Sequence, residues 1–180
     1  MRDSNKKRSS NGVKRIMSFV ITLAILPIFL VACNSRASES GETGVFKGDK
    51  AADFTLNDLK GNEVSLSDFL GKKAIFVDFS ATWCPHCVTA IPLLKDINNK
   101  YTDDSLVILG VFINESKKTI EKFAAKHDIP YPVLIDTGGK VATEYSVSGV
   151  PMFLVIDKSG LISYRGHSIP EDIIDKVVKE

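Results

Sequence analysis

The chain has 180 residues, of which 44% are hydrophobic and 25% are charged, and its formal net charge at pH 7 is +1. This length suits one globular domain with its own core plus an extension, and the composition excludes a disordered or collagen-like chain. Residues 1–32 hold six of the 23 basic and one of the 22 acidic residues, which leaves 17 basic and 21 acidic residues in the remainder. The remainder therefore has no general electrostatic attraction to nucleic acid, and we expect no nucleic-acid partner.

The first 32 residues have the layout of an export signal. A basic segment precedes an apolar run of 17 residues from Ile16 to Ala32, a length that is borderline for a membrane span. The run ends in Leu30-Val31-Ala32-Cys33, which resembles the lipobox of bacterial lipoproteins, where the signal is cleaved before a cysteine that carries lipid. We therefore expect residues 1–32 to be a signal peptide and Cys33 to be lipidated, with an uncleaved signal anchor as the alternative. Either arrangement tethers the protein to the membrane outside the cytoplasm.

Residues 33–48 predict a flexible linker, because they are rich in Ser, Gly and Glu and have no apolar periodicity. A single folded domain is expected at 49–180. Its first segment, ADFTLNDLKGNEVSLSDFLGKK, predicts two short antiparallel strands around the turn at Lys60-Gly61-Asn62. A helical turn that begins at Ser67 should follow.

The next part of the chain predicts a parallel strand–helix–strand unit. Ala74–Ser80 is a nearly unbroken β-branched and aromatic run, as expected of a central strand covered on both faces. A helix from Pro85 to about Tyr101 follows, with apolar residues along one face and a kink at Pro92. A second buried strand at Leu106–Asn114 leads into an amphipathic helix that Ser116 begins.

The C-terminal part predicts a closing antiparallel hairpin and a final helix. The hairpin follows from two apolar runs separated by the turn Lys158-Ser159-Gly160. The expected elements are a strand at Tyr131–Asp136, a helix near Gly139–Tyr145, strands at Val150–Asp157 and Leu161–Gly166, and a helix from Pro170.

Cys84 and Cys87 stand three positions apart in the sequence WCPHC. Thiols at this spacing serve as half of a zinc site, as a static disulfide or as a redox couple. A structural zinc site needs four ligands, and the chain has no second CxxC to supply the other two. Only His86, His127 and His167 could add to the cysteines, and neither His127 nor His167 has a partner at a recognisable spacing. A static disulfide across so short a loop removes little entropy from the unfolded chain. The sequence therefore favours a redox couple and no metal, with His127 and His167 at the surface.

The residues around the thiols indicate how such a couple would work. Pro85 suits the first position of a helix, which makes Cys84 the N-cap, with its sulfur near the amides of the first turn. Those amides and the positive end of the helix dipole stabilise a thiolate at Cys84. Cys87 lies one turn further along the same side, within disulfide reach. Cys84 is thus the expected attacking thiol, and Cys87 the thiol that resolves the mixed disulfide.

This arrangement resembles the thioredoxin superfamily, because VDFSATWCPHC, Pro92 and the later SGVP fall in that family's order. With its export signal, lead-in hairpin and extra helix, the chain is most similar to the TlpA/ResA branch of membrane-tethered thiol-disulfide oxidoreductases. From about Gly48 onward the resemblance implies an α/β thioredoxin fold: a central mixed sheet flanked by helices, with an N-terminal β-hairpin and an extra βα insertion. TlpA-like members usually carry proline directly before the second cysteine, whereas Cys-Pro-His-Cys is familiar from DsbA-like oxidants. His86 therefore leaves the direction of electron flow open.

Asp78 stands in the middle of the predicted central strand, six residues before Cys84. Burial there should raise the pKa of its carboxyl group and let it exchange a proton. In thioredoxins the matching acid is thought to deprotonate the resolving cysteine, which the resemblance implies is Cys87. The alternative is an acid at the solvated end of the strand.

Pro151 matches the cis-proline that thioredoxins carry beside the active site. A cis bond there would leave the backbone of Val150 free to pair with an extended substrate segment. Trp83, directly before the first cysteine, is expected to shield one side of its sulfur, with core filling as the alternative role.

These features together predict an enzyme that uses Cys84 and Cys87 on protein disulfides of the cell envelope and needs no cofactor. The resemblance implies a reductant, for example in cytochrome c maturation, which exchanges electrons with a membrane thiol-disulfide electron-transfer protein. The alternatives are a DsbA-like thiol oxidant and a non-catalytic binding lipoprotein with an inert disulfide. Peroxide reduction is disfavoured, because neither cysteine ends a Pro-x-x-x-Thr-x-x-Cys pattern.

Overall fold

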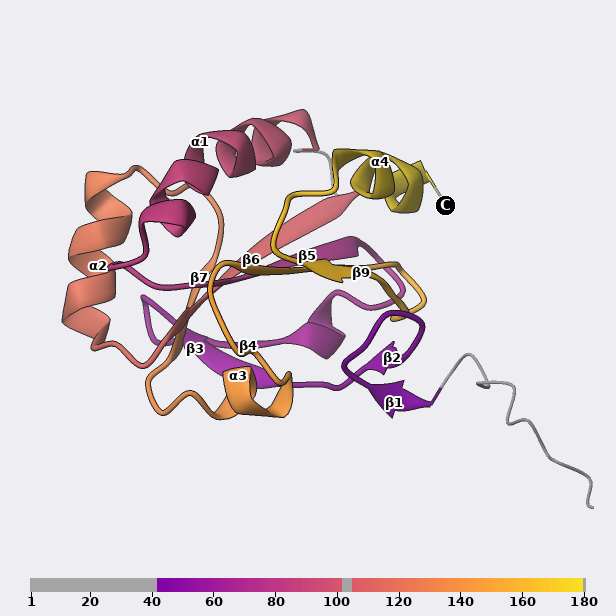
Figure 1. The fold of residues 1–180 in the computed structure, drawn as a ribbon, viewed down its shortest axis with the longest axis horizontal. Helices are drawn as coiled ribbons and strands as arrows, with labels where there is room; N and C mark the ends of the chain where they lie inside the picture. Colours follow the sequence, from indigo (N-terminus) through magenta and orange to yellow (C-terminus); the bar gives the residue numbers. More distant parts are fainter. Residues whose placement is uncertain (1–41, 102–104, 180) are drawn as a thin grey trace, which may run out of the picture. The chain divides into compact units, whose positions relative to one another are not determined.

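The computed structural model describes residues 42–101 and 105–179 (Figure 1). Its main feature is a seven-stranded mixed sheet with the strand order β4-β3-β7-β6-β5-β8-β9. The strands of this sheet are β3 (Thr55–Asp58), β4 (Glu63–Ser65), β5 (Ala74–Ser80), β6 (Leu106–Ile113), β7 (Val133–Asp136), β8 (Met152–Ile156) and β9 (Ile162–Gly166). The helices are the 3₁₀ helix η1 (Leu66–Asp68) and α1 (Pro85–Lys100), α2 (Lys117–Lys126), α3 (Lys140–Glu144) and α4 (Glu171–Lys179). The predicted α/β thioredoxin fold is confirmed.

The connectivity follows the predicted units. Strands β5, β6 and β7 run parallel and are joined through α1 and α2, whereas β8 pairs antiparallel with β5 and forms a hairpin with β9. The lead-in hairpin β3–β4 joins the sheet through an antiparallel pairing of β3 with β7. The helix–strand unit α2–β7 is therefore the expected βα insertion, and it lies between β6 and the lead-in hairpin.

All of β5 is buried, because helices cover both of its faces (Figure 1). Ile75, Val77 and Phe79 pack in one cluster with residues of η1 and α3. Ala74 and Phe76 pack on the opposite face with residues of α1 and α4. Side chains alternate along a strand, so Asp78 points to the face that α1 covers.

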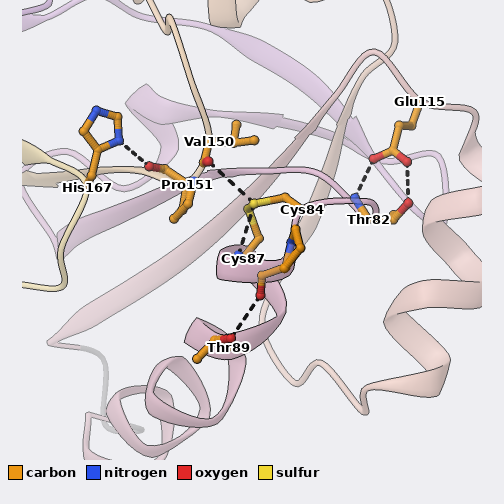
Figure 2. The surroundings of a disulfide bond; sticks show 9 residues. Thr82, Cys84, Cys87, Thr89, Glu115, Val150, Pro151 and His167 are labelled. Atoms are coloured by element: carbon orange, nitrogen blue, oxygen red, sulfur yellow. Dashed lines mark hydrogen bonds between the residues drawn. A yellow bond between two sulfur atoms is a disulfide. The ribbon is translucent and has the colours of Figure 1, made fainter.

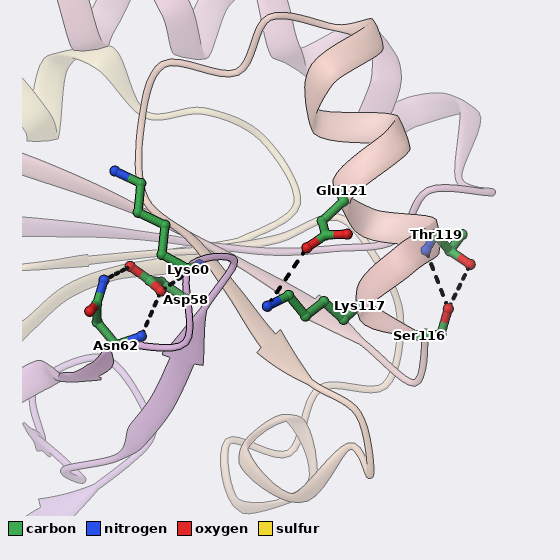
Figure 3. A network of polar contacts seen from close by, with 7 residues as sticks. All are labelled: Asp58, Lys60, Asn62, Ser116, Lys117, Thr119 and Glu121. Atoms are coloured by element: carbon green, nitrogen blue, oxygen red, sulfur yellow. Dashed lines mark hydrogen bonds and ion pairs between the residues drawn. The ribbon is translucent and has the colours of Figure 1, made fainter.

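Several boundaries differ from the predictions for local reasons. The turn after the lead-in hairpin begins at Leu66 and not at Ser67, because the N–H of Ser65 donates a hydrogen bond to the Asp68 carboxylate (2.9 Å) and so caps the turn earlier. Strands β7 and β8 each begin directly after a proline, Pro132 or Pro151, which has no N–H to donate to a ladder. Helix α2 begins after Ser116 as predicted, and the Ser116 hydroxyl accepts the N–H of Thr119 (3.2 Å, Figure 3).

The folded part of the chain begins earlier than the expected boundary between residues 48 and 49. Strand β1 (Thr43–Gly44) pairs with β2 (Lys50–Ala51), and the N–H of Gly48 donates to the carbonyl of Ile162 (2.9 Å). The Arg165 guanidinium also donates to the carbonyl of Val45 (3.2 Å). These contacts use the backbone of the expected linker, which its side-chain composition does not reveal. The signal segment, Cys33 and the rest of the linker up to residue 41 lie outside the described residues.

Within residues 42–101 and 105–179, no helix has the length and apolar character needed to cross a membrane. The apolar run from Ile16 to Ala32 is not part of these ranges.

The carboxyl group of Asp78 is buried without compensation. Its side chain is 4% exposed, and its Oδ1 has no hydrogen-bond partner among the described residues. Burial raises the pKa of Asp78 from 3.8 to about 7, since the charged form loses its hydration. The alternative of an acid at the solvated end of the strand is therefore wrong.

This shift makes the stability of the fold depend on pH. Between about pH 4 and pH 7 the folded protein binds more protons at Asp78 than the unfolded chain does, so its stability falls as pH rises through this window. We expect Asp78→Asn to remove this fall, a relative gain above pH 7 of roughly 4 kcal/mol at about 1.4 kcal/mol per pKa unit. Urea unfolding of the oxidised protein at pH 4.5, 6 and 8 measures the difference. Parallel stability profiles for the two proteins would contradict the assignment.

Candidate active site

The two cysteines lie where β5 passes into α1. Cys84 is the N-cap of the helix, with an extended backbone (φ −87°, ψ 113°), and Pro85 occupies the first helical position. The N–H of Cys87 donates to Cys84 Sγ at 3.2 Å (Figure 2). The two residues form a disulfide, with their Cα atoms 5.3 Å apart. The predicted N-cap geometry is confirmed, so the first-turn amides of α1 are placed to stabilise a thiolate at Cys84 after reduction.

Both cysteines are buried, so little of either side chain is accessible to another molecule. Cys84 is 4% exposed and Cys87 is 2% exposed. Both pack with Ala81 and with the partly buried Val150. The loop that carries Val150 is therefore part of the immediate surroundings of the pair.

The loop before β8 supplies the second wall of the site. The Val150–Pro151 peptide bond is cis. The carbonyl oxygen of Val150 lies 3.5 Å from Cys84 Sγ, and Pro151 is buried behind it (Figure 2). The backbone of Val150 therefore adjoins the sulfur, as the sequence predicts for a segment that pairs with an extended substrate.

His167 contributes to this wall, although the sequence places it only at the surface. Its side chain is exposed, and its Nδ1–H donates a hydrogen bond to the carbonyl of Pro151 at 2.6 Å (Figure 2). This bond ties the segment after β9 to the loop beside Cys84. Residues 151 and 167 meet only because β8 and β9 form a hairpin, so no local pattern in the sequence indicates the contact.

Glu115 is a second residue that sequence reasoning missed. Its two carboxylate oxygens accept the N–H of Thr82 (2.7 Å) and the Thr82 hydroxyl, so both bonds are charge-assisted (Figure 2). Thr82 lies two residues before Cys84, and Glu115 lies two residues after the end of β6. The pair therefore fixes the loop that presents the first cysteine. One feature could have indicated the contact: Thr82 follows β5 and Glu115 follows β6, and the carboxyl ends of adjacent parallel strands meet at one edge of a sheet.

Of the remaining predicted residues, Trp83, Pro85 and His86 adjoin the cysteines in the chain, and His127 does not. Trp83 is 68% exposed, so its alternative role as core filler is wrong, whereas shielding of the sulfur stays a prediction. Pro85 and His86 are exposed on the first turn of α1. His127 lies away from the cysteines at the end of α2, with its ring 4.4 Å from that of Phe123.

A groove of about 470 Å³ is lined by Val150, which adjoins Cys84, and by Pro151. Side chains from α1, β8 and the segment before α4 line it, and none of them is acidic. Its apolar lining includes Ala90, Leu93, Phe153 and Ile169, and its polar lining is His86, Thr89, His167 and Ser168. An open, largely apolar groove that shares Val150 with the surroundings of Cys84 suits an extended peptide better than a small polar molecule.

In residues 42–101 and 105–179, no three His, Cys, Asp or Glu side chains lie close enough together to hold a metal ion.

Comparison with known proteins agrees with this geometry. The model of the AhpC/TSA family matches residues 47–165. The chain is 34% identical over 166 residues to "Thiol-disulfide oxidoreductase ResA" of Geobacillus kaustophilus (89% of this chain, 95% of the relative). It is 35% identical over 169 residues to the protein of the same name from Geobacillus thermodenitrificans (93% of this chain, 94% of the relative).

Solved structures show the same architecture. The thioredoxin domain of a thiol-disulfide oxidoreductase from Bacteroides vulgatus superposes with a TM-score of 0.66 at 27% identity, covering 76% of this chain and 98% of that one. A buried CxxC pair at the start of a helix, a thioredoxin fold and these relatives lead to one assignment. The chain belongs to the AhpC/TSA family of thioredoxin-like proteins, in the group of thiol-disulfide oxidoreductases that includes its ResA-named relatives.

Proposed function

We propose that the protein reduces disulfides in other proteins outside the cytoplasm. The observation that carries the proposal is the position of Cys84 Sγ, at the N-terminus of α1 and 3.5 Å from the Val150 carbonyl, beside a groove open to a peptide. A substrate strand that pairs with the backbone of Val150 brings its own sulfur to Cys84. The resemblance to the TlpA/ResA branch extends the proposal to apocytochromes c as substrates.

The proposed reaction moves two electrons from the cysteine pair to the substrate. The Cys84 thiolate attacks one sulfur of the substrate disulfide, and that bond breaks to release the first substrate thiolate. Cys87 then loses its proton, for which Asp78 is the proposed acceptor, and attacks Cys84 Sγ. The second substrate thiolate leaves, and the protein is left with the Cys84–Cys87 disulfide seen in the structure. A membrane thiol-disulfide electron-transfer protein is the proposed source of the electrons that restore the dithiol.

The activity itself can be tested with insulin as a model disulfide. We expect the purified protein with dithiothreitol to accelerate insulin reduction, and Cys84→Ser to abolish the acceleration because the attacking thiolate is lost. Cys87→Ser should accumulate mixed disulfides, since its Cys84 attacks but nothing resolves the product. Electrophoresis without reductant separates these adducts, and Cys84→Ser is the matched control that forms none. No acceleration by the intact protein and no adduct with Cys87→Ser would favour an inert disulfide in a binding lipoprotein.

The direction of electron flow rests on His86. A protonated imidazole on the first turn adds positive charge near a thiolate that the helix terminus already favours, and a more stable thiolate makes the couple more oxidising. We therefore expect a reduction potential above the value of about −270 mV for thioredoxin, toward that of about −120 mV for DsbA. The resemblance to membrane-tethered reductants nevertheless favours a reductant over a DsbA-like oxidant.

Replacing His86 with proline, which restores the usual motif of the branch, should lower this potential. Equilibration with glutathione measures it, and His86→Ala separates the loss of the imidazole from the effect of the added ring. A potential in both variants that equals or exceeds that of the wild type would show that the imidazole does not set it.

The location is proposed from the N-terminal sequence. Residues 1–32 act as a cleaved signal, and Cys33 carries lipid that holds the protein in the membrane on its outer side. Metabolic labelling with a fatty acid in the bacterial host should mark the wild-type protein and not Cys33→Ser. The variant should be released or left unprocessed, with its insulin reductase activity retained. Equal labelling of both proteins would refute lipidation at Cys33 and favour the uncleaved anchor.

A further inference from the structure

The surroundings of Asp78 on its own sheet face are set by its two neighbours in the ladder. Asp78 pairs with Gly110 of β6 on one side and with Phe153 of β8 on the other. Paired residues in neighbouring strands point to the same face. Phe153 is 2% exposed and covers one flank of the carboxyl group. Gly110 has no side chain to cover the other flank.

The ring of Tyr131 takes the place of the side chain that position 110 lacks. A Cβ atom at Gly110 would lie 3.2 Å from Tyr131 Cε2 and 3.6 Å from Cδ2. The next residue fixes this placement, because the N–H of Gly110 donates to the carbonyl of Pro132 at 2.9 Å. Tyr131 is 4% exposed and belongs to the same buried cluster as Phe76 and Phe153. The carboxyl group of Asp78 is thus flanked by two aromatic residues.

Tyr131 also borders a second groove at the surface. This groove, of about 590 Å³, lies between the β3–β4 turn and α2. Asp58 and Lys60 of that turn line one side of the groove and Glu121 of α2 lines the other (Figure 3). Tyr131 therefore borders both this groove and the position beside Asp78 that Gly110 leaves free.

We propose that the ring of Tyr131 is the barrier that keeps groove water from Asp78, and that Tyr131 is thereby a positioning residue for proton transfer from Cys87. The proposal rests on the proposed reaction, in which the carboxylate of Asp78 takes the thiol proton of Cys87 and becomes a neutral acid. A hydrated carboxylate would be a weaker base, since water stabilises its charged form. Gly110 contributes by leaving room for the ring.

The charges around Asp78 agree with a role for water exclusion. Burial is the cause of the raised pKa of Asp78. Burial, followed by the charge of Asp78, raises the pKa of Tyr131, so the two groups lie within electrostatic reach. Among the buried residues of α1 and α4, the helices that cover this face of the sheet, Cys87 is the titratable group, and Tyr131 is a second titratable group near the acid. The other titratable groups of these helices, such as His86, Lys95 and Asp96 of α1, are not among the buried residues. Strands β6 and β8 place Gly110 and Phe153 beside the acid.

The test is an NMR titration of the Asp78 carboxyl carbon in the full-length oxidised protein. We expect Tyr131→Phe to keep the wild-type pKa within about half a unit, because the ring remains. Tyr131→Ala should lower the pKa by at least about one unit, because it opens the groove onto the carboxyl group. Phe123→Ala is the matched control: it also removes a buried ring on the α2 side of the sheet, where Phe123 packs on Phe112. It should leave the titration of Asp78 unchanged.

A second variant protects the test against misfolding. Tyr131→Leu keeps an apolar side chain of smaller volume and should give a pKa between those of the Phe and Ala variants. The pH profile for resolution of a mixed disulfide should shift toward lower pH in the same order. Folded Ala and Leu variants with the wild-type titration would overturn the proposal, and a drop with Tyr131→Phe would assign the effect to the hydroxyl instead. The titration needs no substrate, so its outcome is independent of whether the protein proves to be a reductase.

Discussion

The site depends on one constraint: Cys84 must be the residue directly before a helix and must also lie only a few residues after a buried strand. β5 leaves the sheet at Ser80, and only four residues separate it from the first residue of α1. In this span, the N–H and the hydroxyl of Thr82 both donate to the carboxylate of Glu115. The N–H of Cys87, in the helix, donates to Cys84 Sγ. Hydrogen bonds therefore hold both the loop before the helix and the sulfur itself.

Strand β5 also carries a buried carboxyl group that does not stabilise the fold. Asp78 occupies a position where an apolar residue would pack as well, and its Oδ1 has no partner among the described residues. Structural economy would remove the acid, so its presence on the face that α1 covers points to chemistry. Phe153, Gly110 and Tyr131 then form a coherent arrangement, because each covers the acid or makes room for a residue that does.

Local sequence patterns predicted the helices and strands well, but they could not predict contacts between segments that are distant in the sequence. The apolar run of β5, the capping residues Cys84 and Ser116 and the turn before β9 each depend on neighbours in the sequence, and the structure confirms them. Glu115, His167 and Tyr131 depend on tertiary contacts to Thr82, Pro151 and Gly110. The pairing of β1 with β2 was not predicted for a related reason. Backbone hydrogen bonds form this pairing, whereas the side chains of the segment have the composition of a linker.

The topology also fixes where β1 and β2 lie relative to the cysteines. β8 runs antiparallel to β5, so Met152 pairs near the end of β5 that precedes Cys84, and Ile156 pairs near its beginning. The turn after β8 therefore lies at the opposite end of the central strand from the active site. Ala51 of β2 donates its N–H to Gly160 in that turn (2.8 Å), and β1 pairs with β2. Strands β1 and β2, the first elements of the described chain, therefore lie at the end of β5 remote from Cys84.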